Sequence, residues 1–157
     1  MEDVELQFNN LVQLHKSTIY TVCYMFTDNQ NEMEDLFQEV LINMWKGYHS
    51  FRGDATVSTW VYRVAMNTCI SMDRKKRRNH SDIFPTSVVP FDSTNDVKSA
   101  QVRHLHERIC RLDVVDRAIV LLWLENLSYA EIGQIIGITP QNVGVKLLRI
   151  KEQLKKM

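Results

Sequence analysis

Glycine and proline are scarce in this chain, which has 157 residues with only five glycines and three prolines. Long segments contain neither residue, and this disfavours a turn-rich sheet protein and favours helices. The chain also lacks any run of about 18 apolar residues, so we expect no helix that inserts into a membrane. The amino terminus, from Met1 to Glu5, is acidic and does not have the character of a secretory signal. These absences predict a cytoplasmic protein.

Cysteine is equally sparse and gives no sign of a disulfide framework. Cys23, Cys69 and Cys110 lie far apart, and their odd number without a CxxC pair favours free thiols. His104 and His106 precede Cys110, but on a helix only residues 106 and 110 share a face, which leaves a metal ligand set incomplete. A glycine-rich phosphate loop, a nucleophile elbow and an acid–base pair are missing as well. The sequence therefore predicts no metal, no cofactor and no catalytic residue.

The net charge is zero, but the charges are unevenly distributed. Residues 28–39 contain five carboxylates and no lysine or arginine, whereas residues 74–78 are all basic. An acidic and a basic element on one neutral chain suit two different partners. Hydrophobic residues make up 45% of the chain, which is enough for two small cores.

Apolar residues recur at helical spacing in the first half of the chain. The spacing predicts three helices, over about 8–26, over about 33–44, and from Val57 to the basic run. The stripe of the first helix comprises Phe8, Leu11, Val12, Ile19, Val22, Cys23 and Phe26. The stripe of the second comprises Met33, Leu36, Phe37, Val40, Leu41 and Met44. In the third, the residues expected to face a core are Val57, Val61, Val64, Thr68 and Met72.

Residues 79–99 interrupt this periodicity and hold Pro85, Pro90 and many small polar residues. Such a composition predicts a flexible linker that divides the chain into domains at residues 1–78 and 100–157. Four further helices are expected in the second domain. The fold class is therefore all-α, with three helices before the linker and four after it.

Residues 128–149 have the form of a helix-turn-helix. Ser128 and Glu131 form a capping box at the start of a short helix, which ends at Gly137 in a tight turn. Thr139 then caps a second helix, with Pro140 at its first position. Gly133 lets the two helices approach closely. The small core between them is expected to contain Ile132, Ile136, Ile138 and Val143.

The last helix has two distinct faces at about 100° per residue. Val143, Leu147, Ile150 and Leu154 gather on one side. The side chains predicted to bind duplex DNA are Thr139, Gln141, Asn142, Val145, Lys146 and Arg149. Glutamine and asparagine can bond adenine bidentately, and lysine or arginine can bond guanine or phosphate. The alternative is a plain helical hairpin with a solvated polar face, but the coincidence of caps, turn glycine and readers favours DNA binding.

Residues 112–122 and 125–133 resemble region four of extracytoplasmic-function sigma factors, in which the helix-turn-helix contacts the minus-thirty-five promoter element. The chain departs from the family pattern at Asp113 and Val114, where proline is frequent, and at Asn126, where glycine is frequent. Residues 141–146 replace the commoner G-T-V-K-S-R. These departures leave the fold expectation intact. Because they include the reading residues, they make the promoter sequence harder to predict.

Residues 31–45 resemble sigma region two, the stretch that docks on a coiled coil of the polymerase's largest subunit. The resemblance implies that core polymerase binds Glu34, Asp35, Leu36, Gln38, Glu39 and Trp45. From charge alone, an ordinary solvated acidic face would be the expectation. The ordered match to the family pattern favours docking.

Residues 58–67 with Asp73 and Arg74 resemble the family's T-W-L-Y-R-I-A-x-N…D-x-x-R, which is assigned to the minus-ten element. Trp60, Arg63, Asn67 and Arg74 fall within about 60° of each other on a helical wheel. The predicted downstream DNA contacts are Trp60, Arg63, Asn67, Arg74, Lys75 and Arg77. An aromatic ring can support an unpaired base while cations hold phosphates. The loop from Tyr48 to Asp54 would hold an extruded base. The alternatives are a core tryptophan and a solvated basic helix end.

The resemblance implies a sigma factor that binds core RNA polymerase and promoter DNA, under the control of an anti-sigma factor. That control is expected because the family's extra promoter-binding and autoinhibitory regions are absent. A stand-alone helix-turn-helix regulator is the first alternative, and it would bind a promoter tightly without polymerase. A metal-dependent enzyme is the second, and it would carry stoichiometric metal.

Overall fold

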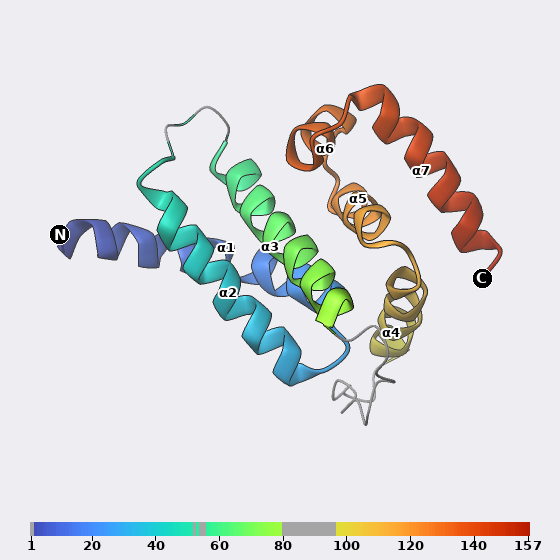
Figure 1. Ribbon diagram of the computed structural model, residues 1–157, viewed down its shortest axis with the longest axis horizontal. Coiled ribbons are helices and arrows are strands. Elements are labelled where there is room, and N and C mark those ends of the chain that lie inside the picture. Colours follow the sequence, from blue (N-terminus) through green and yellow to red (C-terminus); the bar gives the residue numbers. More distant parts are fainter. Residues whose placement is uncertain (1, 52, 54–55, 80–96) are drawn as a thin grey trace.

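The structure, a computed structural model, describes residues 2–51, 53, 56–79 and 97–157, and these residues form seven α-helices and no strand (Figure 1). The helices are α1 (Glu2–Met25), α2 (Gln30–Tyr48), α3 (Val57–Asn79), α4 (Val97–Cys110), α5 (Val114–Leu124), α6 (Tyr129–Ile136) and α7 (Pro140–Lys155). The predicted all-α fold is confirmed. No helix in the described part of the chain is long and apolar enough to span a membrane.

Two helix ends lie within the predicted linker at residues 79–99. Helix α3 continues to Asn79 and α4 begins at Val97. Periodicity misses these ends because one turn of helix carries too few apolar residues to set a pattern. The remainder of the predicted linker lies outside the described residues.

Helices α1, α2 and α3 pack together around the apolar stripes predicted from spacing. Every residue of the predicted α1 and α2 stripes belongs to the core or packs against it. Helix α2 starts at an Asn29 cap, whose side chain accepts a hydrogen bond from the backbone N–H of Glu32 at 2.8 Å. This cap satisfies a donor that the first helical turn leaves open.

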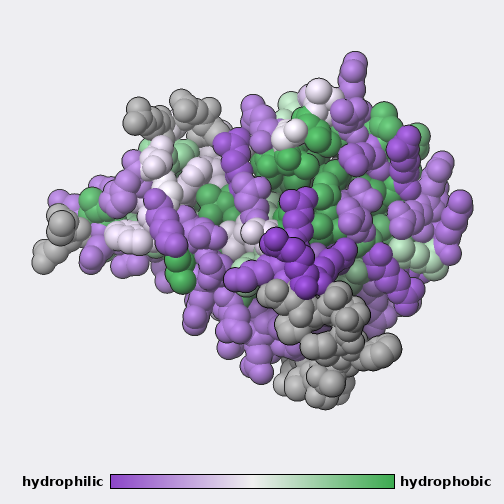
Figure 2. All heavy atoms as spheres, in the orientation of Figure 1, coloured by the Kyte–Doolittle hydropathy of each residue, from purple (hydrophilic) through white to green (hydrophobic). Residues whose placement is uncertain are grey.

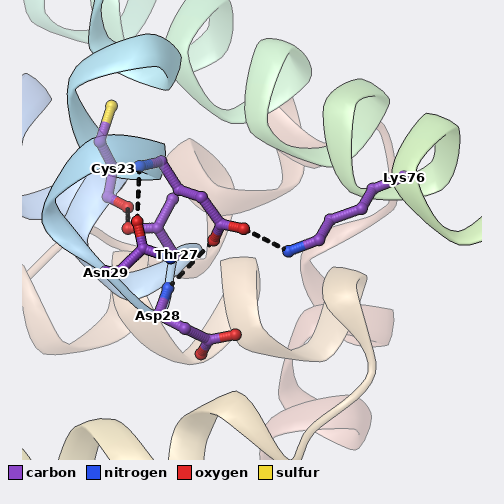
Figure 3. A network of polar contacts seen from close by, with 6 residues as sticks. Cys23, Thr27, Asp28, Asn29 and Lys76 are labelled. Atoms are coloured by element: carbon purple, nitrogen blue, oxygen red, sulfur yellow. Dashed lines mark hydrogen bonds and ion pairs between the residues drawn. The ribbon is translucent and has the colours of Figure 1, made fainter. Parts of the chain in front are cut away.

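A polar network joins the start of α2 to the basic end of α3 (Figure 3). Lys76 Nζ lies 2.8 Å from Glu32 Oε1, and the backbone N–H of Asp28 donates to Glu32 Oε2 at 3.5 Å. Close by, Thr27 Oγ1 donates to the carbonyl oxygen of Cys23 at 2.8 Å. The Lys76 side chain therefore links α3 to α2.

The helix-turn-helix of α6 and α7 forms as its local signals predict. Ser128 and Glu131 make both hydrogen bonds of the capping box, and the predicted Thr139 cap is present. Gly137 has φ 93°, in the left-handed region that glycine enters without strain. A Cβ on Gly133 would lie 2.5 Å from the carbonyl oxygen of Ile138, so only glycine permits this approach of the chain.

The two halves of the chain also pack against each other. Helix α3 contacts α5 and α6, and α1 contacts α4 and α5. Helix α3 therefore buries a second face, which includes Tyr62 and Met66. The predicted core face of α3 is partly wrong, because Val57 and Met72 at its margins are 39% and 37% exposed. Figure 2 shows apolar side chains gathered around α5 and α6, between α3 and α7.

Candidate nucleic-acid and polymerase interfaces

The outer side of α7 carries a face that is open to a ligand. Val143, Leu147 and Ile150 hold the inner side in the core, each almost fully buried. On the outer side, the exposed members of the predicted set are Thr139, Gln141, Asn142, Val145 and Arg149. The Thr139 hydroxyl accepts a hydrogen bond from the backbone N–H of Asn142 at 3.2 Å, so it also holds the helix end. We call the set Gln141, Asn142, Val145, Lys146 and Arg149 the α7 reading face.

Lys146 differs from the other members because it is half-buried and faces α5. Burial raises the pKa of the Asp116 carboxyl, the positive charge of Lys146 acts in the opposite direction, and Asp113 raises the pKa further. The lysine thus already has a carboxylate within electrostatic range before any DNA binds.

Tyr129 lies beside the α7 reading face, although the sequence reasoning did not select it. A Cβ on Gly144 of α7 would lie 3.4 Å from the Tyr129 ring, which shows how closely the ring approaches the helix. The Tyr129 side chain is exposed, so its phenol is available at the α6 side of the reading face. The sequence signal that could have identified Tyr129 is Gly144, because a glycine on α7 leaves room for a bulky neighbour.

Side chains on the predicted downstream face of α3 are more involved in contacts within the chain than those of the α7 reading face. Trp60 is only 9% exposed, and its ring centroid lies 5.2 Å from that of Phe51 and 6.4 Å from that of Tyr48. The expectation that part of this ring belongs to the core agrees with this burial. The ring borders a cavity of about 370 Å³ whose lining also includes the amide side chains of Gln7 and Asn10 from α1.

The other predicted downstream residues lie in different environments. Arg63 is half-buried, and its Nη2 donates to the carbonyl oxygen of Gln134 in α6 at 3.4 Å. Arg77 Nε lies 3.0 Å from Asp73 Oδ2, one turn earlier on α3. The exposed members are Asn67, Arg74, Lys75 and Arg77. Lys75 also lines a cavity of about 440 Å³ together with Asp28, Glu32, Asp35, Asp73 and Arg117.

The predicted polymerase-binding set is divided between surface and core. Glu34, Asp35 and Gln38 are exposed on α2, and Glu39 is half-buried. Trp45 is 38% exposed and packs edge to face against Phe8, with ring centroids 5.0 Å apart. Leu36 is only 6% exposed, so little of its side chain is open to a partner. An apolar residue of the inner stripe is drawn into the core, where it holds the acidic face in place.

Helix α4 joins the two halves through His106 and Cys110. His106 Nε2 lies 2.8 Å from the carbonyl oxygen of Tyr24 and 3.1 Å from that of Thr27. Its distance to Cys110 Sγ is 3.5 Å. Burial raises the pKa of the Cys110 thiol to about 11 despite the nearby charge of Arg117. Among the described residues, no group of three or more potential ligands could hold a metal ion.

Two contacts between the halves were not predicted. The Tyr62 hydroxyl donates to Glu125 Oε2 at 3.4 Å, and burial followed by the charge of Glu125 raises the pKa of Tyr62 to about 12. Arg117 is almost fully buried, where its Nη2 donates to the carbonyl oxygens of Cys110 and Leu112. Its guanidinium carbon lies 5.4 Å from the centre of the ring of Phe26, which directly follows the end of α1. Arg117 therefore anchors α5 to both α4 and the first half.

Comparison with known proteins assigns both halves to known families. The model of Sigma-70 region 2 matches residues 11–79, and that of Sigma-70, region 4 matches residues 103–154. The ECF RNA polymerase sigma factor SigW of Bacillus subtilis (strain 168) is 30% identical in an alignment 165 residues long, which covers 95% of this chain and 87% of SigW.

Two solved structures have the same fold at low sequence identity. The sigma factor RpoE from Bartonella quintana, in complex with the anti-sigma factor NepR, matches with a TM-score of 0.78 at 19% identity, covering 96% of this chain and 95% of RpoE. CnrH, in complex with the cytosolic domain of CnrY, matches with a TM-score of 0.71 at 16% identity, covering 97% of this chain and 87% of CnrH.

Proposed function

The chain belongs to the extracytoplasmic-function family of RNA polymerase sigma factors, and from this premise we propose how its two halves divide the work of promoter recognition. As a sigma factor, it binds core RNA polymerase and directs it to promoters. In our proposal the α7 reading face binds the upstream element as duplex DNA, with the start of the helix in the major groove. The observation that carries this proposal is the exposure of Gln141, Asn142 and Arg149 on one side of a helix whose other side is in the core.

We propose that α3 and the adjoining cavity capture the downstream element after its strands separate. Asn67 and Arg74 are exposed on one side of α3 and supply an amide and a cation. The cavity bordered by Trp60 has an aromatic wall and amide groups, which suit an extruded base. Arg63 and Arg77 join this surface if DNA replaces Gln134 and Asp73 as their partners.

The acidic side of α2 is the proposed docking surface for core polymerase. Glu34, Asp35 and Gln38 project from α2, while Leu36 and Val40 fix the opposite side of the helix in the core. A rigid helix with short acidic side chains suits a basic helical partner. Trp45 lies on the same helix and is available at the edge of this surface.

Further expectations follow from this assignment. We propose domain limits at residues 1–78 and 100–157, a cytoplasmic location beside the polymerase, and no catalytic activity in the chain itself, since the polymerase synthesises RNA. We also propose an anti-sigma partner, because RpoE and CnrH were each solved with a bound partner in the fold that this chain adopts. An anti-sigma protein would act by covering the polymerase-binding and DNA-binding surfaces.

Co-elution and run-off transcription test the proposal. Purified chain should co-elute with core polymerase and start RNA synthesis on a library of genomic templates, with weak promoter binding when the polymerase is omitted. Asp35→Lys should weaken core binding on the order of tenfold, because it places a cation in an acidic docking surface. The matched control Glu107→Lys, which reverses an exposed charge on α4, should bind normally.

Two outcomes would contradict the proposal. Tight promoter binding without polymerase would favour a stand-alone regulator. A chain that neither co-elutes with core polymerase nor initiates on any template is not working as a sigma factor.

A further inference from the structure

The valine at the centre of the α7 reading face has no structural role that accounts for it. Val145 is 49% exposed, and it belongs neither to the hydrophobic core nor to the side chains that pack against the core within the described residues. A β-branched residue is also a poorer helix former than alanine. Neither packing nor helix propensity therefore explains a valine here.

The neighbours of Val145 are polar on both sides. Gln141 lies one turn earlier and Arg149 one turn later on the same side of the helix, and both are exposed. A valine side chain has no hydrogen-bond donor or acceptor, so it cannot extend the hydrogen-bonding pattern of these two residues. It presents two methyl groups at the middle of a face whose other members carry polar groups.

We infer that Val145 recognises the 5-methyl group of a thymine in the upstream promoter element. This inference rests on the proposed function, because it requires the start of α7 to lie in the major groove. Thymine is the base that places a methyl group in that groove, and small apolar side chains contact it there. Val145 thus makes the chain prefer thymine over cytosine at one position, through apolar contact instead of hydrogen bonding.

A second exposed apolar residue on α7 provides a matched control. Leu148 is 64% exposed but lies almost one turn further from the start of the helix. On a helical wheel it falls within about 40° of Gly144, the residue that the Tyr129 ring approaches. Leu148 also falls within about 20° of Gln141, two turns earlier, so it is set apart from Val145 mainly by its greater distance from the end of the helix that enters the groove.

The test uses holoenzyme assembled from core polymerase and the full chain. The holoenzyme first selects upstream elements from a duplex library randomised in that region. Each thymine of a selected element is then replaced singly by deoxyuridine, which removes the methyl group and leaves the hydrogen-bonding edge unchanged. We expect one replacement to weaken binding about three- to fivefold, as the loss of one buried methyl group implies.

The variants identify which side chain makes the contact. Val145→Ser should bind thymine and deoxyuridine equally at that position, whereas Leu148→Ser should keep the difference seen with the wild-type chain. The inference is overturned if the wild-type holoenzyme tolerates every replacement, or if Val145→Ser remains as sensitive as the wild type. In both cases a selected upstream element still supports the proposed function. If no element is selected at all, the proposed function fails, and the inference fails with it.

Discussion

The two surfaces proposed to bind DNA differ in how many contacts their side chains make within the chain. On α7, Gln141, Asn142 and Arg149 project into solvent from a helix held by a buried stripe. On α3, the Trp60 ring is buried and the Arg63 guanidinium is bonded to a carbonyl of α6. In the proposed function, the upstream element would bind α7 without displacing contacts, whereas the downstream element would also have to displace contacts within the chain.

This difference fits the state of the DNA that each surface is proposed to bind. A duplex presents its base edges in the groove, so a rigid exposed helix can read them directly. A separated strand becomes available only later, after the polymerase has opened the DNA. The contacts of α3 with the second half can hold its polar groups in defined positions until that step.

The substitution with the largest expected effect disrupts the α7 surface and changes no residue of α3. Gly133→Ala would place a Cβ 2.5 Å from the carbonyl oxygen of Ile138, so α6 and α7 would have to separate. We expect a loss of about 1–3 kcal/mol in the free energy of unfolding, typical of overpacking, and at least tenfold weaker upstream binding. Chemical denaturation and filter binding measure the two effects.

Gly144→Ala is the control for this prediction. Its Cβ would meet only the Tyr129 side chain, at 3.4 Å, and alanine is the better helix former. This variant should be as stable as the wild type or more stable. Equal destabilisation by both substitutions would mean that the close approach at Gly133 is not what positions α7.

The α7 surface could be predicted in detail because its signals are local. The Ser128 box, the Gly137 turn and the Thr139 cap each lie within a few residues of the helix end that they determine. The burial of Tyr62 could not be predicted, because its partner Glu125 is 63 residues away in the sequence. Periodicity assigns an apolar face to a helix but cannot reveal that a second domain will cover another face.

The same limit explains the residues whose environment differs from expectation. Leu36 lay within a motif that resembles a docking sequence, but its place in the apolar stripe determines its burial. Lys146 was predicted as a free reader, whereas the carboxylate of Asp116 on α5 lies near it. In each case the sequence pattern identified a helix, and the fold decided which side chains on it are exposed.

Replacing one arginine on each surface compares the two surfaces directly, with expected effects on DNA binding of intermediate size. Arg149→Gln should weaken upstream binding by about 1–3 kcal/mol if Arg149 reads a base, with the loss concentrated at one base pair. If it contacts a phosphate, the slope of log affinity against log salt should fall by about 1 for all sequences. Fluorescence anisotropy of holoenzyme on labelled duplexes over a range of salt concentrations separates these cases.

Arg63→Gln should leave upstream binding and its salt slope unchanged, because Arg63 lies on α3. On a single-stranded downstream element it should cost less than Arg149→Gln costs upstream, since wild-type Arg63 must first give up its bond to Gln134. An equal or larger loss of binding for Arg63→Gln would show that the bond to Gln134 does not compete with DNA. The two surfaces would then be equally available to DNA.

The smallest expected effect tests the bond between Tyr62 and Glu125. Burial and Glu125 raise the pKa of Tyr62 from 10.0 to about 12, so the folded state holds this proton more tightly than the unfolded state. The corresponding stability is fully present below pH 10 and is lost as the pH rises towards 12. Tyr62→Phe should cost about 0.5–1.5 kcal/mol at neutral pH, as the loss of one hydrogen bond implies.

Denaturation of both proteins across this alkaline range measures the difference. Wild-type stability should fall more steeply with pH than that of Tyr62→Phe, so the gap between the two should narrow. Tyr129→Phe, which removes a hydroxyl from an exposed ring, should follow the wild-type curve. If Tyr62→Phe also keeps the wild-type dependence on pH, the Tyr62 hydroxyl is not buried in solution as it is in the structure, and the packing of α3 against the second half is weaker than its geometry indicates.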